Sequence, residues 1–68
     1  MAHDLHRYIG RTVLVQLDEH TMTGTLAYAS DRTVTLQNAA LLPDQGEATD
    51  MDGDVIIDRY RVIWMQVA

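Results

Sequence analysis

The arginines and tyrosines of this 68-residue chain are the side chains best suited to hold a polyanion. The five Lys and Arg positions are all arginine, and three of them lie in two short stretches, residues 30–33 (Ser-Asp-Arg-Thr) and residues 58–61 (Asp-Arg-Tyr-Arg). A guanidinium group binds phosphate as a planar fork, and a tyrosine ring stacks on a nucleic-acid base. The alternative is that these arginines pair with Asp31, with Asp58 and with neighbouring subunits.

Three histidines and one acidic stretch raise the question of a metal site. His3 and His6 are three residues apart, which would place both on one face of a helix, but no third ligand is obvious. Residues 50–54 (Asp-Met-Asp-Gly-Asp) resemble part of a calcium loop, but Arg61 stands where such a loop needs its final glutamate. We therefore expect exposed histidines and a solvated acidic loop, with no metal and no cofactor.

Catalytic chemistry has little support in the sequence. Ser30 is the only serine, the chain has no Cys or Lys, and no general base can be identified beside Ser30. Asp31 and Asp58 can be imagined as paired carboxylates, but each also fits an ordinary turn. We expect a binding protein and not an enzyme.

Length and charge restrict the class of protein further. A chain of 68 residues forms one small domain, and it must gain stability from a tight core or from oligomerisation. The net charge of −5 argues against strong, non-specific binding of nucleic acid but leaves room for a local arginine site. Disulfides are excluded because cysteine is absent. No apolar run approaches the ~20 residues that span a membrane. We expect a cytoplasmic protein without membrane partners.

The residues that precede the arginine stretches predict a short helix followed by strands. Leu5, Tyr8 and Ile9 share one helical face, and Gly10 is a natural stop, so we expect a helix within residues 1–10. From residue 12 the apolar period changes to two, which predicts strands over 12–17, 21–28 and 33–37, with turns at 18–21 and 29–32. Residues 39–42 either continue the third strand or bend it.

The C-terminal third contains a long loop and an unusual last strand. Residues 43–54 hold the only proline and five of the ten acidic residues, which predicts an acidic loop. A strand resumes at 55–58, residues 59–61 interrupt it, and residues 62–67 form the last strand. This strand is apolar on nearly both faces, with Ile63, Met65 and Val67 alternating with Val62 and Trp64, so we expect it to be covered on two sides.

This order of elements resembles the Sm/LSm family, including its bacterial Hfq branch. Residues 12–42 resemble the first Sm motif, with Gly24 and Leu26 at its Gly-x-Leu positions, and residues 55–68 resemble the second. The spacing from Gly24 to Leu36 is closer to the Hfq branch, which suggests a bacterial or phage protein. The polar signature departs from the family, because Asp58 stands where the second motif has Arg and Arg59 where it has Gly.

The resemblance implies a fold and an assembly. The fold would be mostly β, with a short N-terminal α-helix followed by a five-stranded, strongly bent SH3-like barrel, all within a single domain of residues 1–68. Subunits of this family close into rings of six or seven by pairing the fourth strand of one with the fifth of the next. The residues that this pairing would place at the interface are Val55, Ile57, Val62, Ile63, Trp64, Met65 and Val67. A monomeric barrel is the alternative.

The resemblance also implies a binding site. In Sm proteins the turns that correspond to residues 30–33 and 58–61 lie side by side at the ring pore, where they hold a uridine of single-stranded RNA. The residues carried over to that role are Ser30, Asp31, Arg32, Thr33, Arg59, Tyr60 and Arg61.

Three hypotheses about function follow from this sequence. The first is a ring-forming Sm-like protein that binds single-stranded RNA. The second is an Sm-fold assembly module without RNA binding, which the acidic charge and the altered second motif favour. The third is a monomeric SH3-like adaptor that binds a peptide.

Overall fold

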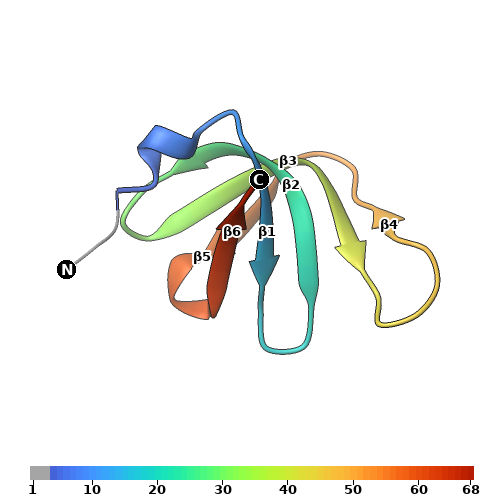
Figure 1. The fold of residues 1–68 in the computed structure, drawn as a ribbon. Coiled ribbons are helices and arrows are strands. Elements are labelled where there is room, and N and C mark those ends of the chain that lie inside the picture. Colours follow the sequence, from blue (N-terminus) through green and yellow to red (C-terminus); the bar gives the residue numbers. More distant parts are fainter. Residues whose placement is uncertain (1–3) are drawn as a thin grey trace.

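The computed structural model describes residues 4–68 and shows one strongly bent antiparallel sheet (Figure 1). The elements are the 3-10 helix η1 (His6–Tyr8) and the strands β1 (Thr12–Gln16), β2 (Thr21–Ala29), β3 (Thr33–Leu42), β4 (Thr49–Asp50) and β5 (Val55–Asp58), then the 3-10 helix η2 (Arg59–Arg61) and the strand β6 (Trp64–Val67). The apolar residues of β1, of β2 as far as Leu26 and of β3 as far as Leu36 point inward with the predicted period of two. Beyond Leu26 the alternation breaks, because Tyr28 is 54% exposed and Ala29 is buried.

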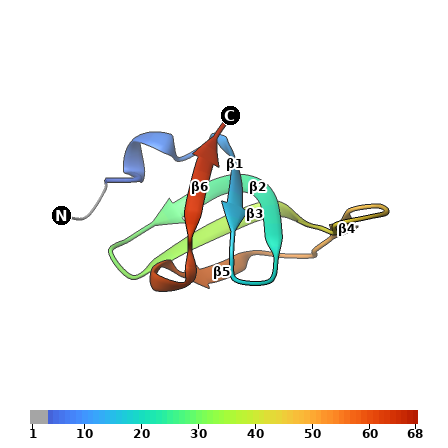
Figure 2. The same ribbon diagram turned by 60° about the horizontal axis from the view of Figure 1, so that its bottom comes forward.

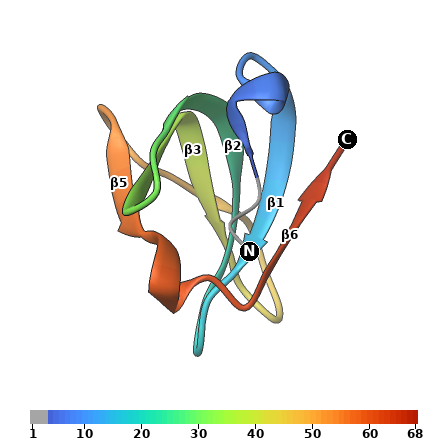
Figure 3. The ribbon, with the colours of Figure 1, turned by 90° about the vertical axis from the view of Figure 1, so that its left-hand side faces the viewer.

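The sheet has two ends that do not meet. Its order is β4-β3-β2-β1-β6, and β5 pairs with β3 on the same edge as β4. Within the described chain β5 pairs only with β3, and β6 pairs only with β1. Figure 3 shows β5 and β6 on opposite sides of the bent sheet. Each of these strands therefore has one edge without a partner in the same chain.

The core lies inside the bend of the sheet and draws on β1, β2 and β3 and on one residue of β5. Its buried side chains come from both motifs of the sequence, and they are Val13, Val15, Met22, Leu26, Ala29, Val34, Leu36, Ala39 and Ile57. Leu5 and Tyr8 of the N-terminal segment pack against this cluster, whereas Ile9, which the helical pattern placed beside them, is 41% exposed.

The predicted N-terminal α-helix is wrong. Residues 4–68 contain no α-helix, and η1 spans only three residues. Gly10 has a φ of 93°, its backbone N–H donates to Leu26 O, and Leu26 N donates to Arg11 O. The residues directly after η1 are thus hydrogen-bonded to β2, so the segment before them is too short to propagate an α-helix. His3 and the first three residues of the expected helix lie outside the described part of the chain.

The predicted five strands are also wrong, because the described residues form six. β3 runs on through Ala39 to Leu42, so it extends beyond the reach of β5. The backbone edge at Ala40 and Leu41, which β5 does not reach, pairs with β4, a two-residue strand inside the predicted loop of residues 43–54. Figure 2 shows β4 and its flanking loop extending from the end of the sheet farthest from the N-terminal segment.

Gly24 lies where β2 and β3 change register. The register shifts between Thr23 and Thr25, and a Cβ on Gly24 would lie 3.1 Å from Gln37 O and 3.2 Å from the Ala39 Cα. Both contacts are with backbone, which cannot move aside as a side chain can. Glycine at this position therefore allows the close approach of the two backbones.

Candidate nucleic-acid interface and free sheet edges

The two arginine-bearing turns lie side by side. Thr33 and Asp58 are register partners at the ends of β3 and β5. Beyond them, Arg59 N donates to Arg32 O at 2.8 Å, and Arg59 Nη1 donates to Ser30 O at 2.6 Å. The half-buried Arg59 side chain therefore ties the turn of residues 30–33 to the turn of residues 58–61.

The turn before β3 is organised by Ser30. Its Oγ accepts hydrogen bonds from Arg32 N at 3.1 Å and Thr33 N at 3.0 Å, and Ser30 N donates to Thr33 O at 2.8 Å. A serine that bonds to backbone two and three residues ahead stabilises a tight turn. Ser30, which was predicted to contact a base, thus has its hydroxyl engaged within the turn.

The turn after β5 presents an aromatic ring and a cation to solvent. Tyr60 is 81% exposed, and Arg61 Cζ lies 5.8 Å from the centre of its ring. η2 closes with a hydrogen bond from Val62 N to Arg59 O, which fixes the backbone on both sides of Tyr60. An exposed ring on an ordered backbone can accept a stacked base with little loss of entropy.

Competing ion pairs of the two exposed arginines, Arg32 and Arg61, are not found among residues 4–68. Between positions 4 and 68, no salt bridge joins Arg32 or Arg61 to a carboxylate. Asp31 and Asp58 are both exposed, and each lies in the same turn as an arginine. The arrangement therefore offers two solvent-accessible guanidinium groups and one ring, with two carboxylates close by.

The residues predicted to form a subunit interface fall into three groups. Ile57 is 6% exposed and belongs to the core of its own chain. Ile63 and Trp64 are 58% and 46% exposed. The remaining predicted interface residues pack partly against the core, namely Val55, Val62, Met65 and Val67.

The expected alternation along residues 62–67 breaks at its start. Val62 packs against the core and Ile63 is exposed, the reverse of what a strand beginning at residue 62 would give. η2 ends at Arg61 and the chain bends at Ile63, so β6 begins only at Trp64. Ile63 and Trp64 are consequently consecutive exposed apolar residues.

Sequence reasoning missed Ile56, which is 68% exposed on β5. The signal was present, because strand alternation places residue 56 on the face opposite to residues 55 and 57.

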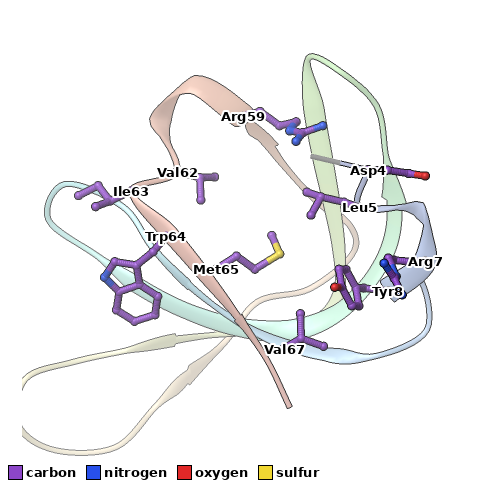
Figure 4. Close-up of a pocket in the computed structure, with 10 residues that line it drawn as sticks. All are labelled: Asp4, Leu5, Arg7, Tyr8, Arg59, Val62, Ile63, Trp64, Met65 and Val67. Atoms are coloured by element: carbon purple, nitrogen blue, oxygen red, sulfur yellow. The ribbon is translucent and has the colours of Figure 1, made fainter. Parts of the chain in front are cut away.

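A groove of about 640 Å³ lies between the N-terminal segment and β6 (Figure 4). Its lining is mostly apolar and consists of Asp4, Leu5, Arg7, Tyr8, Arg59, Val62, Ile63, Trp64, Met65 and Val67. The side chains of Leu5, Val62 and Met65 point toward the same space in Figure 4, whereas those of Ile63 and Trp64 point to the other side of the chain. The inner side of β6 is thus incompletely covered within one chain.

Residues 4–68 show neither a metal site nor a membrane-spanning helix. No group of three or more His, Cys, Asp or Glu side chains there is placed to hold a metal ion. His6 Nδ1 lies 3.0 Å from Asp4 Oδ1, and hydrogen bonds from the His6 backbone N–H and ring lower the pKa of Asp4. No described helix is long and apolar enough to cross a membrane.

Comparison with known proteins identifies the fold. No protein-family model matches the chain, and no curated protein matches it in sequence. Among solved structures, a heptameric archaeal Sm protein matches with a TM-score of 0.83 and 26% identity over 94% of each chain. The Pyrococcus abyssii Sm protein in complex with a uridine heptamer matches with a TM-score of 0.82 and 26% identity, over 94% of this chain and 92% of that one. The P. aerophilum SmAP1 heptamer matches with a TM-score of 0.81 and 25% identity, over 94% and 86%.

The chain therefore has the fold of Sm proteins, and this part of the sequence-based prediction is confirmed.

Proposed function

We propose that this protein is a ring-forming, Sm-like protein that binds single-stranded RNA at the turns of residues 30–33 and 58–61. The observation that carries the proposal is the tie between these two turns through Arg59, which leaves Tyr60 and two further arginines exposed at one place. The uridine heptamer bound by the Pyrococcus abyssii Sm protein supports RNA as the ligand class.

The free edges of β5 and β6 support a ring. They lie at opposite ends of the sheet and differ in sequence, so pairing one with the other joins copies head to tail. Such an interface closes into a ring if the rotation between copies divides a full turn, and a closed ring leaves no exposed strand edge. The heptamers of the archaeal Sm proteins support a ring of seven subunits, and a ring of six or seven subunits stays a prediction for this chain.

The three exposed groups take separate roles in RNA binding. Tyr60 stacks on a base, while the guanidinium groups of Arg32 and Arg61 contact phosphates or base edges. Arg59 and Ser30 act indirectly, because their hydrogen bonds hold the turns in place. A ring repeats the site once per subunit, so weak contacts act together on one RNA strand.

The carboxylates set the strength of this binding. The chain carries −5, and Asp58 stands next to Arg59 where the family motif has a positive charge. A carboxylate beside a phosphate is repulsive, so we propose weak, salt-sensitive binding of short U-rich or A-rich RNA. The same charges favour the alternative proposal, an Sm-fold assembly module that does not bind RNA.

The shorter turn after Gly24 supports placement in the Hfq-like branch of bacteria or phages.

Fluorescence anisotropy with labelled heptauridine, measured at several salt concentrations, tests the proposal. Tyr60→Ala and Arg61→Ala should each weaken binding, and Arg61→Ala should also reduce the salt dependence by somewhat less than one unit per site for single-stranded RNA. Arg7→Ala is the matched control, because Arg7 is also exposed and its Cζ lies 5.6 Å from the ring centre of Tyr8. Equal effects of Arg61→Ala and Arg7→Ala would show that the turns are not the binding site, and no binding by the wild type would favour the assembly module.

A further inference from the structure

Two large apolar side chains stand on the free edges of the sheet and point away from the core. Ile56 on β5 is 68% exposed, and Trp64 on β6 is 46% exposed. Each lies on the outer face of its strand: Ile57 next to Ile56 is buried, and Met65 next to Trp64 packs partly against the core. Their directly opposed register partners within the chain are polar, Thr35 for Ile56 and Gln16 for Trp64.

Pairing of the two edges would bring these side chains onto one face. Strands that join in one sheet keep their faces continuous, because side chains alternate with a period of two on both strands. Val55 and Ile57 of one copy would then continue the inner face formed by Met65 and Val67 of the next. By the same rule, Ile56 of one copy falls on the outer face that carries Trp64 of the next.

The register of such a pair leaves Trp64 within reach of Ile56. Both edge strands have four residues, Val55–Asp58 and Trp64–Val67. Aligned end to end in antiparallel fashion, Ile56 stands opposite Gln66 and diagonal to Trp64. Moved by two residues, Ile56 stands directly opposite Trp64. Directly opposed Cβ atoms are about 5 Å apart and diagonal ones about 7–8 Å, and an aromatic ring spans either distance.

We propose that Trp64 of one subunit packs on Ile56 of the next, and that this contact seals the outer face of the subunit interface. The inference rests on the proposed ring. It adds the pair of side chains that would make β5 of one subunit pair with β6 of the next in preference to another strand edge. An exposed isoleucine and an exposed tryptophan each lose apolar surface on contact, which favours association and disfavours pairing with a polar edge.

The composition of the chain makes the contact easy to measure. It contains no cysteine and a single tryptophan, so introduced thiols and native fluorescence both report on one place. The double variants Ile56→Cys/Trp64→Cys and Ile56→Cys/Gln66→Cys should be oxidised and separated on a non-reducing denaturing gel. A disulfide needs Cα atoms about 4.4–6.8 Å apart, so only the directly opposed pair should form a ladder of linked subunits. Ile56→Cys alone and Tyr28→Cys/Trp64→Cys are controls that should give no ladder.

Wild-type fluorescence provides a second readout that needs no substitution. The emission of Trp64 should move to shorter wavelength as protein concentration rises and the ring assembles, and native mass spectrometry on the same samples reports the assembly. A ladder from either double variant together with this shift supports the contact. A ring mass with no ladder from either variant and unchanged emission overturns the contact while the ring stands. A single-chain mass at all concentrations overturns the ring and the contact together.

Discussion

Arg59 differs in its surroundings from Arg32 and Arg61, although the sequence alone makes the three look alike. Arg59 is half-buried and donates to Ser30 O, whereas Arg32 and Arg61 are exposed. The motif that the sequence resembles has glycine at position 59. Arginine at this position therefore adds a link between two turns, while Asp58 beside it adds a negative charge at the proposed site.

Replacing Asp58 by Asn tests whether its charge opposes RNA. The exposed carboxylate lies at the end of β5, opposite Thr33. At about 8 Å in water, two like charges repel by ~0.5 kcal/mol, so removing one should tighten binding roughly twofold per neighbouring phosphate. Anisotropy titrations with heptauridine at low salt measure the change. Asp50→Asn on β4 removes the same charge away from the turns and should have a much smaller effect. Equal effects of the two variants would show that only net charge matters.

At the scale of elements, the sheet was more predictable than the segments that join it. Alternating apolar residues placed the first three strands, and the interruption at residues 59–61 corresponds to η2. The apolar face of the N-terminal segment could not distinguish an α-helix from the 3-10 turn that forms, because Leu5 and Tyr8 pack on the core from a 3-10 turn as well. β4 was not predictable either, since Thr49 and Asp50 are polar and pair only because β3 continues past β5.

The candidate site was predictable in its residues but not in their separate roles. The sequence pointed to the arginines and to Tyr60 through their types, and the family resemblance placed the two turns together. Ser30 and Arg59 hold the turns through hydrogen bonds with backbone oxygens and N–H groups. These bonds depend on the local backbone geometry, which residue types alone do not predict. Ile56 was not predicted, because the family resemblance assigned only Val55 and Ile57 of this strand to the interface.

Gly24→Ala tests the bend of β2. The added Cβ would lie 3.1–3.2 Å from backbone atoms of β3, so the two strands must separate slightly or the ladder must shift. Overpacking of this kind costs about 1–3 kcal/mol. Urea unfolding should show this loss of stability. Thr25→Ser at the next position, which adds no atom, should leave stability nearly unchanged. A neutral Gly24→Ala would mean that the close approach is easily relieved.

Arg59→Met tests the tie between the two turns. Methionine keeps much of the apolar stem but cannot donate to Ser30 O. A hydrogen bond of this kind contributes about 1 kcal/mol, so unfolding should occur at lower urea concentration. RNA binding should weaken as well, since the turns would no longer be held together. Arg32→Met, which changes an exposed arginine of the same site, should weaken RNA binding without a comparable loss of stability.

For the whole molecule, the net charge bears on the proposed RNA binding, whereas the unpaired strand edges bear on the proposed assembly. The net charge of −5 per chain makes long-range attraction of RNA weak, so the proposed binding would come from contacts within the turns. The proposed assembly would depend instead on the unpaired edges of β5 and β6 and on the groove beside β6, where apolar surface remains uncovered in one chain. RNA binding should therefore respond strongly to salt, and assembly only weakly.

Because the proposed ring buries surface that a single chain leaves open, folding and assembly should be coupled. A partner that binds only the folded chain stabilises it by mass action, so the melting temperature should rise with protein concentration. Thermal unfolding at a series of concentrations measures this. Ile56→Ser and Trp64→Ser should lower the melting temperature and flatten its dependence on concentration, because both remove apolar surface from the free edges. Tyr28→Ser, which changes a side chain 54% exposed on β2, should leave the slope unchanged. A wild-type melting temperature that does not depend on concentration, together with a single-chain mass, would contradict assembly through these edges.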